Sequence, residues 1–351
     1  MTIKFRFVWV DDTVERAQNF IDGLNGSLRK TPVETDLEVV AVTTTVFDDL
    51  SQKATEWISN PPDLIMLDHD FSKVANRMFA LSGSALAHLL RIQLPRTPIV
   101  CVSGQQVNSD QFNIEDLSEY TYIFDVNQIN GEENLERLFS IAKDFNLLCF
   151  PEKKAVRQAL VDVLLPPESD KSSLLSVLPE EFEGTFIHGT SPHRMARWVL
   201  NILMRRPGFL CDPLEVATFL GLNEAAFTGK VKQHFEAALY KGPFATDTKP
   251  LWWASALTDV LYQALPQQMA SSPSSAGRHF AGIVEEDFSR CGVTNEHTPA
   301  PDVVAYTDST ETERRAVRSS HTIPLSDEAS SILGFSTRLR IRNVRRGASV
   351  G

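Results

Sequence analysis

Residues 63–70 read DLIMLDHD, a short apolar run that ends abruptly in acids. The four apolar residues at 64–67 suit a strand that is buried on both faces of a parallel sheet. Pro61 and Pro62 precede the run and argue against a helix that continues through it. Asp68 would therefore stand at the carboxyl end of a buried strand, which is where open α/β sheets build their binding sites.

Apolar β-rich runs and amphipathic runs alternate through residues 1–150. We expect strands at residues 5–10, 37–42, 64–67, 99–102 and 122–124. Helices are expected after the strands, at residues 15–24, 47–58, 85–92, 115–120 and 134–145. Five strand–helix pairs in succession predict an α/β fold with one doubly wound, five-stranded parallel sheet of the flavodoxin-like kind.

Beyond residue 150 the pattern predicts a mainly helical domain and then a small β-containing C-terminal tail. Helical periodicity covers residues 153–165, 195–203, 214–222, 225–239 and 251–265. Residues 267–277 are rich in Gln, Ser and Pro and predict a loop, whereas short strands are expected at 303–306, 316–319 and 337–344. The predicted organisation is an α/β domain (1–150), a helix and linker (151–180), a helical output or interaction module (181–266), a linker and irregular segment (267–300), and the β-containing tail (301–351).

The composition is that of an ordinary globular protein, with 351 residues, 42% of them hydrophobic and 23% charged. A formal net charge of −11 argues against a general nucleic-acid or anionic-membrane binder as the role of the whole chain, although a local basic patch remains possible. The four cysteines are scattered, which favours reduced thiols over disulfides or a zinc site. Because no signal peptide or membrane-length run is present in the sequence, we expect a cytoplasmic protein without membrane contact.

Polar residues follow three of the expected strands at the point where each strand ends. Asp11 and Asp12 follow the first strand, Asp68 the third and Ser103 the fourth. The carboxyl ends of parallel strands meet at one edge of a sheet, so these side chains should lie close together. Carboxylates in such a group can share Mg²⁺, which prefers oxygen ligands. A carboxylate held there can also act as a nucleophile toward a phosphate donor, and a nearby hydroxyl can bind a phosphoryl oxygen.

Three segments together resemble the receiver domain of two-component response regulators: VWVDD at 8–12, DLIMLD at 63–68 and TPIVCVSG at 97–104. The segment LSGSALAHLL at 81–90 is similar to the family's helix after the phosphorylation loop. The resemblance covers residues 1–147 and does not extend into the rest of the chain. It implies the flavodoxin-like receiver fold for this part of the protein.

The resemblance also implies a role for each residue that matches the family's motifs. Asp11 and Asp12 would be metal-binding acids, and Asp68 would be both a metal ligand and the phosphoacceptor. Asp70 would offer its backbone carbonyl to the metal, and Ser103 would be the switch hydroxyl. Mg²⁺ would be the cofactor, and a histidine kinase or another phosphodonor would be a partner.

Two features depart from the family's pattern. The family has a lysine at the end of the fifth strand, whereas residues 122–126 read YIFDV here and the next lysine is Lys143. Asp125 thus stands where a cation is expected, although Lys73 in the loop after Asp68 could substitute for that lysine. The loop after Asp68 is also long, and the Asp-His-Asp at residues 68–70 resembles a divergent receiver branch proposed to process phosphate esters.

Two basic segments in the second half could contact an anion or nucleic acid. The helix–glycine–helix spacing at residues 213–236 resembles a helix-turn-helix with Lys230 and Lys232 on its second helix, although a corner in a helical bundle has the same spacing. Arg338, Arg340 and Arg342 alternate with apolar residues, which predicts a strand with one basic face. The alternative for that strand is a sheet edge kept soluble by its charge.

These observations favour a regulatory signalling protein over a turnover enzyme. Phosphorylation of Asp68, with Mg²⁺ bound, would control the helical module. Three alternatives stay open: a degenerate receiver that acts as an interaction module without phosphorylation, a phosphoesterase-like enzyme that uses Asp68 and Asp70, and a DNA-binding regulator. We expect a protein partner for the helical module, DNA is not favoured, and a homodimer is left open.

Overall fold

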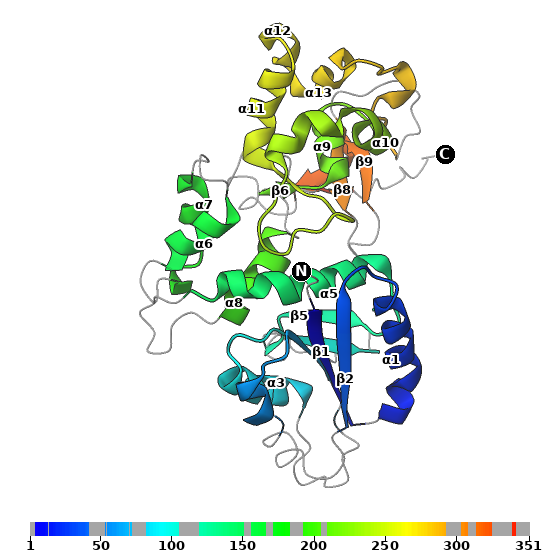
Figure 1. The fold of residues 1–351 in the computed structure, drawn as a ribbon. Coiled ribbons are helices and arrows are strands. Elements are labelled where there is room, and N and C mark those ends of the chain that lie inside the picture. The colour runs from blue at the N-terminus through cyan, green and yellow to red at the C-terminus, as the bar shows by residue number, and fades with distance from the viewer. Residues whose placement is uncertain are drawn as a thin grey trace, which may run out of the picture. The chain divides into compact units, whose positions relative to one another are not determined.

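The computed structural model describes residues 4–12, 14–41, 53, 55–69, 71, 82–104, 119–150, 156–165, 171–182, 192–204, 209–292, 303–307, 314–324 and 339–341. The chain divides into two compact units (Figure 1). Unit 1 comprises Met1–Ile202 and Gly242–Thr248, and unit 2 comprises Leu203–Lys241 and Lys249–Gly351. The chain therefore passes from one unit to the other three times.

Unit 1 contains one five-stranded sheet in which all neighbouring strands are parallel. The strand order is β2-β1-β3-β4-β5. This is the flavodoxin-like order that receiver domains share, so the predicted fold class is confirmed. The strands are β1 (Lys4–Asp11), β2 (Glu34–Ala41), β3 (Leu64–Asp68), β4 (Ile99–Ser103) and β5 (Tyr122–Asp125). The helices among them are α1 (Val14–Leu28), α3 (Gly83–Gln93) and α5 (Glu132–Asp144), with Lys53 and residues 55–59 also helical.

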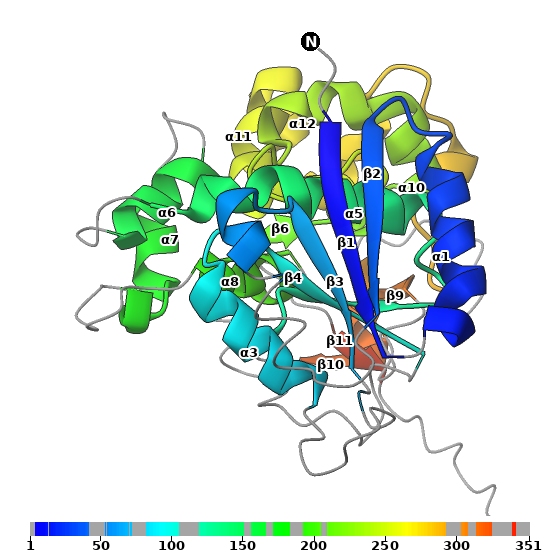
Figure 2. The same ribbon diagram turned by 60° about the horizontal axis from the view of Figure 1, so that its bottom comes forward.

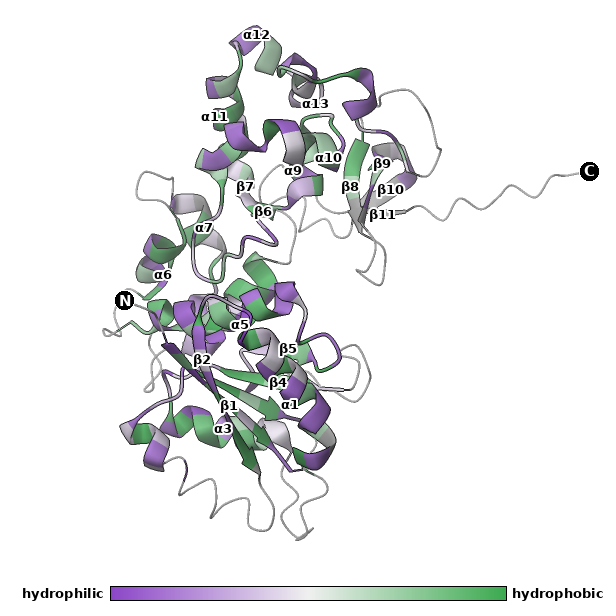
Figure 3. Ribbon diagram, turned by 45° about the vertical axis from the view of Figure 1, so that its right-hand side comes forward, coloured by the Kyte–Doolittle hydropathy of each residue, from purple (hydrophilic) through white to green (hydrophobic). Residues whose placement is uncertain are grey.

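Helices cover both faces of this sheet, and α3 and α5 lie on opposite faces (Figure 2). On one face, Val8 and Val10 join a buried apolar cluster that includes Leu86 and Leu90 of α3. On the other face, the ring of Phe7 lies 5.7 Å from that of Phe139 in α5. Strand β4, buried at every position, is coloured as hydrophobic in Figure 3. The continuous apolar runs of the sequence are thus explained by burial on both faces.

The strand registers align the carboxyl ends of the central strands. Val10 pairs with Leu67, Asp68 with Val102, and Ser103 with Asp125. Each of these strands therefore delivers its last residues to the same edge of the sheet.

Unit 1 continues past the sheet into further helical segments. These are a 3-10 turn (Phe145–Leu148), α6 (Val156–Leu164), α7 (Ser172–Val177), a 3-10 turn (Glu180–Phe182) and α8 (Pro192–Trp198), with a π-helical turn at Val199–Leu203. His193 of α8 is within 3.2 Å of the Thr121 hydroxyl, at the start of β5, and its ring lies 4.8 Å from that of Phe145. The first compact unit is therefore larger than the α/β domain expected at residues 1–150.

Unit 2 combines short helices with two small sheets. The helices are α9 (Pro213–Phe219), α10 (Glu224–Ala226), α11 (Ala254–Ala264), α12 (Gln267–Ala270) and α13 (Pro273–Ala276), with 3-10 turns at Gly277–His279, Glu285–Asp287 and Ser319–His321. The strands β6 (Leu210–Cys211) and β7 (Trp252–Trp253) form an antiparallel pair. The strands β8 (Val303–Thr307), β9 (Arg314–Arg318), β10 (Thr322–Pro324) and β11 (Leu339–Ile341) form a four-stranded sheet in the order β10-β11-β8-β9. The expected helical part with a β-containing tail is confirmed.

Several expected elements of unit 2 differ from the structure. Residues 225–239 do not form one helix, because α10 passes into a π-helical turn (Phe227–Val231) and then a 3-10 helix (Lys232–Ala238). Gly229 lies inside this segment and weakens a regular helix, while Phe227 and Phe235 pack their rings edge to face at 6.0 Å. Residues 267–277, expected as a loop, contain α12 and α13.

Other differences concern the ends of the predicted elements. The strand β7 occupies the beginning of the segment at 251–265, and β6 and β10 were not predicted because strands of two or three residues carry almost no pattern. The helix expected at 115–120 lies outside the described residues except for its last two positions. Among the described residues, no helix is long and apolar enough to cross a membrane.

Candidate functional site

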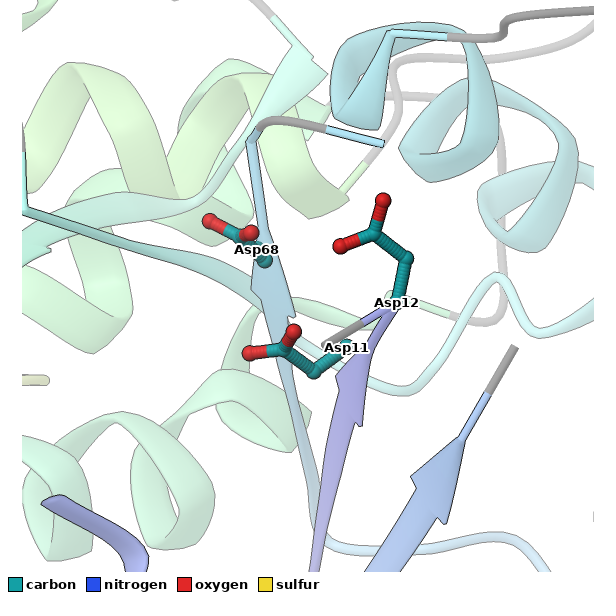
Figure 4. Close-up of side chains that lie close together, drawn as sticks. All are labelled: Asp11, Asp12 and Asp68. Carbon is teal, nitrogen blue, oxygen red and sulfur yellow. The ribbon is translucent and has the colours of Figure 1, made fainter. Parts of the chain in front are cut away.

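Three carboxylates meet at the carboxyl edge of the five-stranded sheet (Figure 4). Asp11 ends β1, Asp12 follows it, and Asp68 ends β3. Each carboxylate has an oxygen that lies within 4.8 Å of an oxygen of the other two. Asp11 is 4% exposed, whereas Asp12 and Asp68 are half-buried and so accessible to a ligand. The structure thus brings together three of the acids that the sequence singled out.

Two hydrogen bonds orient the carboxylates of Asp11 and Asp68. The indole Nε1 of Trp9, a residue that is itself 2% exposed, donates to Oδ2 of Asp11 over 3.3 Å. The backbone N–H of His69 donates to Oδ1 of Asp68 over 2.7 Å. Such donors hold a carboxylate in one rotamer.

This group of oxygens fits a hard divalent cation. Mg²⁺ is usually held by one or two carboxylates together with waters and substrate oxygens, and the half-buried positions of Asp12 and Asp68 leave room for such ligands. Bringing three carboxylates within this distance raises their mutual repulsion, which a bound cation would offset. The donor set contains no sulfur or imidazole, so it favours Mg²⁺ over zinc.

The start of α3 lies against the end of β3, a contact that the sequence analysis missed. The backbone N–H of Gly83 donates to the carbonyl of His69 over 2.9 Å. A Cβ atom at position 83 would lie 2.2 Å from the backbone oxygen of Asp68 and 2.6 Å from the hydroxyl oxygen of Tyr120. Only glycine therefore permits this approach. The sequence feature that could have predicted this approach is the Ser82-Gly83 pair at the start of the helix. Ser82 caps α3 by accepting from the backbone N–H of Ala85.

Two buried residues, Cys101 and Tyr120, lie near Asp68 and His69. Tyr120, 1% exposed, has its hydroxyl oxygen 3.3 Å from Nδ1 of His69. Burial raises the pKa of the Cys101 thiol well above its usual range, and the negative charge of Asp68 raises that pKa further. Cys101 therefore stays a neutral thiol at physiological pH and is not available as a nucleophile.

Strands β4 and β5 deliver Ser103 and Asp125 to the same edge. Ser103 is 3% exposed and lies in register with Asp125. Oδ1 of Asp125 accepts from the backbone N–H and from Nδ2 of Asn127, each over 2.9 Å. This carboxylate is thus bound into a local turn after β5. Asp70 and Lys73 lie outside the described residues.

Of the basic residues predicted for anion contact, Lys230 and Lys232 make contacts within unit 2. Lys230 forms an ion pair with Asp287 and donates to the carbonyl of Gly282 over 3.1 Å. Nζ of Lys232 lies 5.9 Å from the centre of the Trp252 ring. Both lysines therefore have partners within unit 2. Arg340 lies in β11, and Arg338 and Arg342 lie outside the described residues.

The helix–turn–helix spacing at residues 213–236 has a structural explanation within unit 2. Gly221 joins α9 to the next helical segment with a positive φ of 71°, and the backbone oxygen of Ser274 would lie 2.0 Å from a Cβ at that position. The apolar residues of both segments belong to one buried cluster with those of α11. The two helical segments therefore pack in the core of unit 2, as in the corner of a helical bundle.

No protein-family model and no curated protein match the chain. Among solved structures, it is similar to a response regulator from Burkholderia pseudomallei with a phosphorylated aspartic acid, calcium ion and citrate, at 16% identity and a TM-score of 0.25. That match covers 36% of this chain and 64% of the other, so the chain spans just under two thirds of that protein. A CheY-like receiver domain protein from Methanospirillum hungatei JF-1 matches at 18% identity with a TM-score of 0.27, over 40% of this chain and 98% of the other.

Proposed function

We propose that the sheet of unit 1 is a signalling receiver in which Asp11, Asp12 and Asp68 bind Mg²⁺ and Asp68 accepts a phosphoryl group. The observation that carries this proposal is the meeting of the three carboxylates within 4.8 Å at the carboxyl edge of a sheet with receiver strand order. Asp70 would add its backbone carbonyl to the metal site, and Ser103 would act as the switch hydroxyl.

In this proposal the phosphoryl transfer is a nucleophilic substitution at phosphorus. A carboxylate oxygen of Asp68 forms the new O–P bond while the donor's P–N bond (in a phosphohistidine) or P–O bond (in an acyl phosphate) breaks. The leaving group departs with the electron pair and takes up a proton. A bound Mg²⁺ would supply the positive charge that balances the transferring phosphoryl oxygens. The His69 N–H keeps Asp68 oriented, and Ser103 donates a hydrogen bond to the phosphoryl group in the product.

Phosphorylation would matter through a change in the rest of the chain. A phosphoryl group adds negative charge and strong acceptor oxygens at the edge of the sheet, which biases the elements packed there. The upstream partner would be a histidine kinase or another phosphodonor, and unit 2 would contact a protein partner.

A second candidate function is a receiver that serves as an interaction module without phosphoryl chemistry. The observation that favours it is Asp125, which ends β5 where the receiver family has a lysine. The hydrogen bonds from Asn127 occupy one oxygen of this acid but supply no positive charge to the site.

The two candidates are separated by treating the full chain with acetyl phosphate and measuring its intact mass. We expect the addition of one phosphoryl group that requires Mg²⁺, is lost in Asp68→Ala and is retained in Asp22→Ala, a matched exposed aspartate on α1. Labelling that survives Asp68→Ala would contradict the assignment of the site. No labelling and no Mg²⁺ binding would favour the interaction module. Repeated turnover of phosphate esters that is lost in Asp68→Asn would instead indicate a phosphoesterase.

A further inference from the structure

Residues Gly242–Thr248, here termed the clasp, belong to unit 1 although both flanking segments belong to unit 2. The clasp packs on α5, the helix that covers one face of the receiver-like sheet. Its contacts join residues that are about 100 positions apart in the chain, so they form only when the two parts of the chain are both folded.

Three side chains of α5 form hydrogen bonds with the clasp. The backbone N–H of Phe244 donates to Oδ2 of Asp144 over 2.9 Å, and the carbonyl of Phe244 accepts from Nη1 of Arg137 over 3.2 Å. The backbone N–H and the hydroxyl of Thr248 both donate to Oε2 of Glu136, over 3.0 and 2.7 Å. Both backbone groups of one clasp residue are therefore bound by charged side chains of a single helix, which is a specific attachment.

The clasp also carries unfavourable features that a permanent attachment would not need. Phe244 is fully buried and has a φ of 66°, a left-handed conformation that is strained for a bulky side chain. The buried hydroxyls of Thr246 in the clasp and Ser140 on α5 have no hydrogen-bond partner among the described residues. Burial raises the pKa of Asp144, which means that its charged form is held at a cost.

Strong specific contacts combined with local strain characterise a segment that is held in place by its surroundings and opens as a unit. We propose that the clasp is a releasable segment of unit 1, which detaches from α5 and docks on it again as one piece. When it opens, the face of α5 bearing Glu136, Arg137 and Asp144 becomes free for another contact. This proposal does not depend on whether Asp68 is phosphorylated.

Limited proteolysis of the full chain tests the clasp directly. Trypsin cleaves after Lys241 at the start of the clasp, whereas Lys249 is followed by Pro250 and resists cleavage. Cleavage after Lys241 reports the population in which the clasp is open. We expect this cleavage to be at least about tenfold faster in Phe244→Ala, because the buried ring is lost, and several-fold faster in Glu136→Ala.

A matched control is Glu132→Ala, which changes an exposed acid on the same helix, and it should cleave at the wild-type rate. Hydrogen exchange in the same samples should rise in residues 242–248 and in α5 while the strands of the sheet stay protected. That exchange pattern separates clasp opening from global unfolding, and Glu136→Ala keeps the test valid if Phe244→Ala fails to fold. Unchanged cleavage and exchange in Glu136→Ala, or exchange that rises equally throughout unit 1, would overturn the proposal.

Discussion

At the scale of single residues, Gly83 decides how closely α3 approaches the end of β3. An alanine Cβ at this position would lie 2.2 Å from the backbone oxygen of Asp68, so the helix or the strand end must move. We expect Gly83→Ala to lower the free energy of unfolding by roughly 1–3 kcal/mol, as for other overpacked sites. Phosphoryl labelling of Asp68 should fall as well, because the displaced residue carries the site. Denaturant unfolding and intact mass spectrometry measure the two effects.

Gly26 on α1 provides the control for this substitution. A Cβ at position 26 would meet nothing within 4 Å, and alanine favours a helix interior over glycine by about 0.5–1 kcal/mol. Gly26→Ala should therefore leave stability unchanged or raise it, with labelling intact. Equal losses in the two variants would show that the approach of α3 to Asp68 is not what makes Gly83 necessary.

His193 gives unit 1 a pH dependence with a defined sign. Its burial, and secondly the charge of Arg91, lower its pKa from 6.5 to about 3. The unfolded chain therefore binds a proton below pH 6.5 that the folded chain does not bind. The contribution to stability is complete above pH 6.5 and is lost progressively as the pH falls toward 3, at about 1.4 kcal/mol per pH unit.

We expect the free energy of unfolding of unit 1 to be lower at pH 5 than at pH 7 by about 2 kcal/mol from this group. His193→Gln cannot titrate and should lose this difference, whereas His88→Gln on the exposed face of α3 should keep it. Urea denaturation at the two pH values provides the measurement. The same pH dependence in wild type and His193→Gln would rule out His193 as its origin.

At the scale of elements, the sequence predicted the central strands well because β1, β3 and β4 are apolar runs that stop at a polar residue. Asp11, Asp68 and Ser103 are the last residues of their strands. The same sequence positions therefore predicted both the strand ends and the acidic cluster. Residues 225–239 could not be predicted in the same way. Their apolar spacing resembles a regular helix, and the π and 3-10 turns follow from the packing of Phe227 and Phe235, which a linear pattern does not contain.

The helix α9 starts with a reciprocal cap that should contribute measurably to the stability of unit 2. Oδ1 of Asp212 accepts from the backbone N–H of Glu215, and Oε2 of Glu215 accepts from the backbone N–H of Asp212, both over 2.9 Å. Asp212→Ala should lower the stability of unit 2 by about 1 kcal/mol, since the substitution leaves the buried N–H of Glu215 without its acceptor. Asp212→Asn retains an acceptor oxygen and should lose less. Thermal unfolding followed by circular dichroism ranks the variants, and equal losses would contradict the capping role.

At the scale of the whole molecule, the chain runs from unit 1 to unit 2, returns for the clasp and leaves again. Local sequence patterns cannot predict this return, because it depends on hydrogen bonds of Phe244 with Asp144 and Arg137, which lie about 100 residues earlier in the chain. The same limit applies to His193, whose packing against Thr121 and Phe145 brings α8 into unit 1. What the sequence predicted of this molecule is the receiver-like sheet and its acids. Contacts between distant segments supplied the rest.

Reductive trapping tests directly whether Asp68 is the phosphoacceptor of a metal-binding receiver site. An acyl phosphate is reduced by borohydride, which converts the labelled aspartate to homoserine, and peptide sequencing by mass spectrometry then locates it. After treatment with acetyl phosphate and Mg²⁺, we expect homoserine at position 68, and none when Mg²⁺ is withheld. Homoserine at another aspartate, or none at any position while the protein binds Mg²⁺, would contradict the assignment of Asp68 as the phosphoacceptor.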